Sequence, residues 1–145
     1  MIKPEDFKDI FDECSLQGEK IVITSDLHRT LDFVKTRYSF DTLKDILAVD
    51  KRDKGIELTY HLYSYRDDED LWISIYVKNE AESIVDLYKS AIADENEIYD
   101  MFGIKFIGNE SLKRLYMPEN WDGHPLKKDY AEKDSRLVWN DDNNS

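Results

Sequence analysis

The sequence is poor in the residues that build covalent or metal-bound frameworks. Its 145 residues include one cysteine, three prolines, five glycines and three histidines. The single cysteine, Cys14, excludes an internal disulfide and any iron–sulfur or zinc site built from several thiolates. A chain of this length buries about 68–70% of its unfolded surface, so a core can form without such frameworks. We therefore expect one domain, stabilised by packing, in a reducing compartment.

Long apolar runs and clusters of positive charge are also missing. No run approaches the roughly 20 apolar residues that cross a bilayer. The first residues, MIKPEDFKDIF, lack the basic and then apolar pattern of a signal peptide. The formal net charge of −12 repels nucleic acid and anionic lipid. These features predict a cytoplasmic protein that binds no nucleic acid.

Recognisable catalytic motifs are the third absence. The sequence contains no glycine-rich nucleotide loop, no nucleophile elbow and no H-E-x-x-H zinc motif. Glu97 and Asp100 are spaced so that they share a helix face, where they could bind a divalent cation. A small metal-dependent enzyme that uses Glu97, Asp100 and His124 is therefore one hypothesis. The competing interpretation is that these carboxylates bond the backbone or pair with lysines.

The first part of the chain has helix and strand patterns in alternation. Pro4 begins a predicted helix that ends at Gly18. The β-branched run at 20–24 predicts a strand, and Asp26 is placed to cap a second helix. The apolar face of the first helix comprises Phe7, Ile10, Phe11 and Cys14, and that of the second comprises Leu27, Leu31, Val34 and Tyr38.

Three strands are predicted next, at 43–51, 56–64 and 71–77, in an antiparallel meander with one mostly apolar face. Ser83 is expected to cap a helical stretch through Ile92, which 94–104 continues until Gly103 ends it. The buried side of the continuation comprises Ile98, Met101 and Phe102. The fold class predicted is α+β: a two-layer sandwich with a mainly antiparallel sheet, helices on one face and an extended C-terminal segment.

The chain from Lys105 onward has no obvious regular element. Its prolines and glycines interrupt helix and strand, yet it carries apolar residues at intervals up to Tyr130. Such a segment is expected to lie on another surface, either of its own domain or of a partner protein. We predict a core domain at 1–104, a partner-binding segment at 105–132 and a flexible tail at 133–145.

The residues of the stretch ENEIYDMFGIKFIGNESLKRLYMPENWDGHPLKKDY, at 95–130, carry a resemblance to a known family. They resemble the signature of the C subunit of proton-pumping NADH–quinone oxidoreductase, respiratory complex I. They are equally similar to the matching small subunits of energy-converting membrane-bound [NiFe] hydrogenases and related dehydrogenases. The residues that carry the structural part of the signature are Glu95, Glu97, Asp100, Phe102, Gly103 and Arg114.

The resemblance implies a subunit that binds no flavin, cluster or metal of its own. Iron–sulfur clusters, and the [NiFe] centre, flavin or quinone, are then expected in partner subunits. It also implies packing on the large subunit related to the [NiFe]-hydrogenase large chain, beside iron–sulfur subunits, on the cytoplasmic side of the membrane. Contact with the membrane would be only through the complex. The partner interface that it implies comprises Trp121, Gly123, His124, Pro125, Leu126, Lys127, Lys128, Asp129 and Tyr130.

The chain departs from the family pattern at several positions. Asn96 stands where arginine is usual, and Asn109 and Glu110 stand where the first His-Pro pair is usual. The parent complex is therefore of the NADH–quinone type or, as the alternative, of the hydrogenase type. A free-standing adaptor that kept this fold is a further hypothesis.

Overall fold

The computed structural model describes residues 14–110, 124 and 126. Two helices and seven strands follow one another in this range, together with one short 3-10 turn. They are β1 Cys14–Gln17, β2 Lys20–Ile23, α1 Leu27–Tyr38, β3 Thr42–Asp50, η2 Arg52–Lys54, β4 Ile56–Ser64, β5 Glu69–Val77, β6 Glu80–Glu82, α2 Ala91–Phe102 and β7 Lys105–Ile107. None of the described helices is long and apolar enough to cross a membrane.

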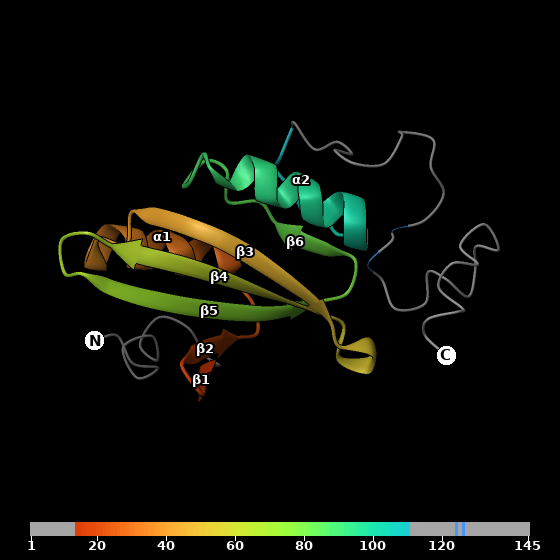
Figure 1. Cartoon of the computed structure of the whole chain (residues 1–145), viewed down its shortest axis with the longest axis horizontal. Helices are drawn as coiled ribbons and strands as arrows, with labels where there is room; N and C mark the ends of the chain where they lie inside the picture. The colour runs from red at the N-terminus through yellow and green to blue at the C-terminus, as the bar shows by residue number, and fades with distance from the viewer. Residues whose placement is uncertain (1–13, 111–123, 125, 127–145) are drawn as a thin grey trace, which may run out of the picture.

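Five of the strands form one sheet in the order β1-β2-β5-β4-β3 (Figure 1). The predicted meander of β3, β4 and β5 is antiparallel and is confirmed. β2 pairs with β5 in parallel, a pairing that the sequence did not predict. It arises because α1 carries the chain from β2 across the sheet to β3, at the far edge. The fold is therefore α+β with a mixed sheet.

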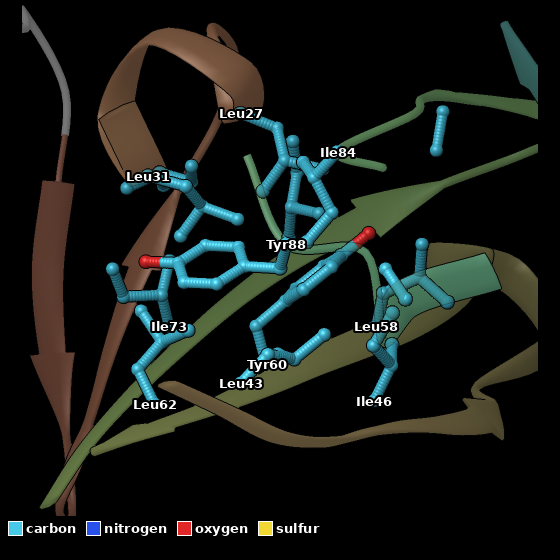
Figure 2. Close-up of a cluster of buried hydrophobic side chains, with 14 of the residues drawn as sticks. Leu27, Leu31, Leu43, Ile46, Leu58, Tyr60, Leu62, Ile73, Ile84 and Tyr88 are labelled. Carbon is cyan, nitrogen blue, oxygen red and sulfur yellow. The ribbon is translucent and has the colours of Figure 1, made fainter. Parts of the chain in front are cut away.

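The core lies between the sheet and the two helices. Strand alternation turns the even-numbered residues of β4, such as Tyr60 and Leu62, toward the helices. Figure 2 shows Leu27 and Leu31 of α1 packed among these sheet residues. Ile98 of α2 belongs to the same buried cluster. Both helices therefore cover the same face of the sheet, and α2 lies beside the edge strand β3 (Figure 1).

The opposite face of the sheet carries polar and aromatic side chains. The Nζ atom of Lys20 lies 2.5 Å from Oε2 of Glu57, whose carboxylate is almost fully buried. The ring of His61 stacks on Trp72 with 4.6 Å between the ring centroids. His61 therefore has a structural environment on this face of the sheet.

The prediction for Cys14 was wrong. Residues 4–13 of the expected first helix lie outside the described residues, but Cys14 is in β1 and pairs with Ile23. Gly18, expected to stop a helix, instead has a left-handed φ of 63° in the two-residue turn between β1 and β2. The helical spacing did not reveal that this segment would pair, as a strand, with the β-branched strand β2.

The helix expected from Ser83 to Ile92 was also wrong in its first part. The chain forms turns before α2 begins at Ala91. The Ser83 hydroxyl donates to the Glu95 carboxylate, and the Tyr88 hydroxyl donates to the carbonyl of Phe40 at 2.5 Å. These long-range bonds, with burial of Ile84 and Tyr88 in the core, replace a local helix.

Beyond Gly103 the chain forms one more short strand. β7 pairs in parallel with β6, so Lys105–Ile107 lie on the core although no element was expected there. Phe106 points inward and is buried, while Ile107 is 56% exposed. The division of the chain at residues 104 and 132 remains a prediction, and the tail 133–145 lies outside the described residues.

Candidate functional site

The part of the predicted site that the structure describes is centred on α2. Three signature residues of this helix, Glu95, Asp100 and Phe102, are buried. Glu97 of the same helix is exposed. Gly103 follows the last helical residue with a φ of 79°, and its N–H donates to the carbonyl of Tyr99 at 2.9 Å. The predicted helix end is therefore confirmed.

Glu95 is a buried acceptor that joins three parts of the fold. Its carboxylate accepts the Ser83 hydroxyl at 2.8 Å, the Ile84 N–H at 2.9 Å and the side-chain amide of Asn109 at 2.9 Å. Burial raises the pKa of the Glu95 carboxyl, and the three bonds act in the opposite direction. Because all its partners donate, the site fits an acceptor-only side chain.

The two side chains that bond to Glu95 were hard to anticipate from the sequence. Ser83 was expected to be a helix cap, and Asn109 stood out only as a turn residue and a departure from the family pattern. Asn109 is buried with its amide directed to Glu95. The buried network is therefore structural in form: it fastens the start of α2 to the ends of β6 and β7.

The opposite end of α2 is held by residues from much later in the chain. Nδ1 of His124 lies 2.8 Å from the carbonyl oxygen of Asp100, so this nitrogen carries a proton and donates. The Leu126 N–H donates to the carbonyl of Met101 at 2.8 Å. These two bonds satisfy carbonyls that the helix itself leaves unpaired.

Gly103 is matched to the imidazole of His124. A Cβ atom added at Gly103 would lie 2.8 Å from Cδ2 of His124, closer than real Cβ atoms approach other atoms. The ring of Tyr99 lies on the same side of the helix, with 6.0 Å between its centroid and that of His124. Glycine is therefore required at 103 by both its φ and its neighbour.

The geometry does not assemble the hypothetical metal site. Glu97 is exposed and Asp100 buried, and His124 contacts the backbone of Asp100. Across residues 14–110, 124 and 126, no group of three or more histidine, cysteine, aspartate or glutamate side chains is placed to hold a metal ion.

A second acidic environment lies near the start of α2. Asp94, in the first turn of the helix, has its pKa raised to about 6 by burial and by the nearby charges of Asp45 and Glu97.

The N-terminus of α1 also has an acidic neighbour. Asp26 makes no side-chain cap bond, and Oε1 of Glu82 accepts the His28 N–H at 3.1 Å instead. The predicted cap by Asp26 was therefore wrong.

Most of the predicted interface lies outside the described residues. Of the residues predicted to meet a partner, only His124 and Leu126 are described. The remaining members are Trp121, Gly123, Pro125, Lys127, Lys128, Asp129 and Tyr130, together with Arg114 of the structural signature.

Comparison with known proteins gives a consistent result. Residues 21–136 match the family described as respiratory-chain NADH dehydrogenase, 30 kDa subunit. The chain is 38% identical over 120 residues to the C subunit of NADH-quinone oxidoreductase from Roseiflexus castenholzii, covering 79% of this chain and 66% of the relative. With the C subunit from Trichlorobacter lovleyi the identity is 37% over 123 residues, covering 79% and 75%.

Other relatives are much longer than this chain. Against the C/D subunit of NADH-quinone oxidoreductase from Phocaeicola vulgatus the identity is 33% over 120 residues, covering 79% of this chain but 23% of the relative. The match likewise covers 47% of the C subunit from a Ruegeria species.

A solved structure shares the fold. It is a chain in the structure titled membrane-bound sulfane sulfur reductase, an archaeal respiratory membrane complex, with a TM-score of 0.73 and 22% identity. The match covers 97% of this chain and 88% of that one.

Proposed function

Because the chain belongs to the family of the 30 kDa subunit of respiratory-chain NADH dehydrogenase, we propose that it is a non-catalytic subunit of an ion-pumping oxidoreductase. It packs on the hydrogenase-like large subunit, beside iron–sulfur subunits, on the cytoplasmic side of the membrane. There it stabilises the module that transfers electrons. The observation that carries the proposal is the family match over residues 21–136.

The long relatives support the choice of partner. A protein whose name combines C and D joins a stretch like this chain to a second subunit in a single polypeptide. Two subunits that function when covalently joined are expected to be neighbours when they are separate. We therefore take the large subunit as the direct partner. The redox groups, which include iron–sulfur clusters and a flavin, quinone or [NiFe] centre, are expected in the other subunits.

The proposed interface is the C-terminal strap, residues 121–130. It combines rigid aromatic side chains, Trp121 and Tyr130, with a proline at 125 that limits the entropy lost on binding. Lys127, Lys128 and Asp129 offer charge-assisted hydrogen bonds at the contact. The bonds of His124 and Leu126 to α2 support this assignment because they hold these two residues at a defined place on the core.

The buried carboxyl groups of α2 also agree better with a structural subunit than with an enzyme. Glu95 is fully buried and bonded on all sides to its own domain, so no substrate reaches it. Asp100 is buried as well. These two buried signature residues therefore support the surface that meets the partner without taking part in chemistry.

A paired deletion tests the proposal. A tagged full-length chain is expressed in its native host, and the detergent-solubilised complex is captured through the tag. We expect the large subunit and iron–sulfur subunits to co-purify. Deleting 121–130 should abolish capture, while deleting 136–145, which removes the same number of residues, should leave it intact. Normal capture without residues 121–130 would count against the proposed interface.

The captured partners also identify the parent complex. Mass spectrometry that finds quinone-reductase subunits supports the NADH–quinone type, and a [NiFe] large chain with its cluster subunits supports the hydrogenase type. Capture of neither, from membranes in which the chain is abundant, would favour a free-standing adaptor and would contradict the proposed function.

A further inference from the structure

At Leu126, in the C-terminal strap, the backbone and the side chain have different surroundings. Leu126 is bonded to α2 through its backbone N–H, yet its side chain is 54% exposed. Ile107 is equally exposed, at 56%, but there strand alternation alone accounts for it, because the neighbouring Phe106 points into the core. No regular element dictates the orientation of Leu126. Its position depends on the contacts that fasten it to the end of α2.

Building on the proposed function, we infer that Leu126 is an apolar anchor presented to the large subunit, and that Gly103 and His124 are the residues that position it. The anchor fits a partner surface with an apolar pocket large enough for one branched side chain. A side chain with a fixed backbone binds such a pocket with less loss of conformational entropy than one on a free segment.

Three consecutive carbonyls at the end of α2 show how the positioning works. Tyr99 accepts from the backbone of Gly103, Asp100 from the imidazole of His124, and Met101 from the backbone of Leu126. His124 and Leu126 thus provide donors for two carbonyls of the helix end that the helix itself leaves unpaired. Since the donors of His124 and Leu126 meet acceptors that are fixed in the helix, the position of the Leu126 backbone is set by α2.

Gly103 makes this arrangement possible. The imidazole occupies the space where a side chain at 103 would begin, with 2.8 Å between Cδ2 and a built Cβ. Gly18 provides a matched comparison, because its φ of 63° is also left-handed but nothing lies within 4 Å of its built Cβ. An alanine at either position experiences backbone strain, and only at 103 does it displace His124.

The test uses matched pairs of variants in the full-length chain. Leu126→Ala keeps the backbone bond and removes the proposed anchor, and Ile107→Ala removes an equally exposed side chain elsewhere. We expect Leu126→Ala to weaken capture of the large subunit about tenfold, and Ile107→Ala to leave capture unchanged. Both isolated variants should melt at the temperature of the parent chain, since neither side chain is buried.

The positioning residues have a separate readout. In the isolated chain, His124→Ala should speed hydrogen exchange of the Leu126 amide about tenfold or more and change exchange in β4 little. Gly103→Ala should speed exchange of the Leu126 amide by at least as much, and it should also speed exchange in β4 because it lowers the global stability. Gly18→Ala should leave the Leu126 amide as it was. His124→Asn retains an N–H donor close to the position of Nδ1, and it should restore slow exchange and capture.

The outcomes separate the anchor from the proposed function. If the parent chain captures no large subunit, the proposed function fails. If the parent chain captures it but Leu126→Ala and Ile107→Ala behave alike, the anchor is wrong. If capture falls in Gly103→Ala while exchange at Leu126 stays slow, the positioning role is wrong.

Discussion

The two ends of α2 are fastened to the rest of the chain in contrasting ways. Near the start of the helix, the Glu95 carboxylate is fully buried and gathers donors from Ser83, Ile84 and Asn109. At the other end, acceptors of the helix backbone receive donors from His124 and Leu126 in a half-exposed place. The first attachment is inseparable from the core, while the second can open without unfolding it.

The difference has an energetic basis. A buried donor that loses its acceptor costs about 1–3 kcal/mol, because water cannot replace the partner. Helix-end carbonyls near solvent are hydrated when a capping group leaves, so their loss costs less. One helix therefore combines a rigid attachment that specifies the fold with an adjustable one suited to assembly.

The largest expected effect is at Glu95. Glu95→Ala removes the acceptor that three buried donors share and should lower the free energy of unfolding by about 3–5 kcal/mol. Chemical denaturation monitored by circular dichroism measures the change. Glu97→Ala, on the exposed side of the same helix, should stay within about 0.5 kcal/mol of the parent chain. If Glu95→Ala and Glu97→Ala lowered the free energy of unfolding equally, the buried attachment at Glu95 would not be the stronger of the two attachments of α2.

An intermediate effect is expected at Gly103. Gly18→Ala should cost about 1 kcal/mol through its left-handed φ alone. Gly103→Ala should cost about 2–3 kcal/mol, because it also expels His124 and gives up two hydrogen bonds. The extra cost has an upper limit, since the strap can leave and relieve the overlap. A loss as large as that of Glu95→Ala would show that the end of α2 is as inseparable from the core as its start.

Glu82 extends the comparison to α1. Its carboxylate accepts the His28 N–H and takes the place of the cap that Asp26 does not supply. Glu82→Ala should destabilise the chain by about 1 kcal/mol. Glu80→Ala, in the same strand and exposed, is the matched control and should have no measurable effect. If Glu80→Ala proved as costly as Glu82→Ala, the capping assignment would be wrong.

The regular elements could be predicted where a local pattern was sufficient. Alternation at 56–64 indicated β4, and the spacing of Leu27, Leu31 and Val34 indicated α1. Cys14 was wrongly assigned to a helix because, over a few residues, the same apolar spacing fits both a helix and a strand that pairs with a neighbour. The segment from Ser83 to Tyr88 was misassigned because its conformation depends on Glu95 and Phe40, which are distant in sequence.

The candidate site, too, could be predicted from the sequence only in part. Resemblance to a family identified Glu95, Gly103 and His124 as members of one signature, but no periodicity relates Gly103 to His124. Their contact exists because His124, although distant in sequence, lies against the end of α2. Asn109 escaped prediction because its partner Glu95 is charged and buried, a combination that hydropathy patterns cannot indicate.

The smallest expected effect is the pH dependence at Asp94. This residue lies in the first turn of α2, where the helix dipole favours the ionised form. Burial and the charges of Asp45 and Glu97 prevail and raise its pKa from 3.8 to about 6. The folded state therefore holds the proton more tightly than the unfolded state, and the stability that this provides is complete below about pH 4. It is lost as the pH rises through about 6.

Asp94→Asn should remove this contribution to the pH dependence. The gain in unfolding free energy over the parent chain should be near zero at pH 4 and reach at most about 1 kcal/mol at pH 7, since solvent screens a partly exposed carboxyl. Denaturation curves at several pH values measure it. Glu95, whose pKa is also raised, titrates in both chains and cancels in the difference. Glu80→Gln is the control. If the gain in unfolding free energy at Asp94→Asn were the same at pH 4 and pH 7, the surroundings of Asp94 would not destabilise its ionised carboxylate.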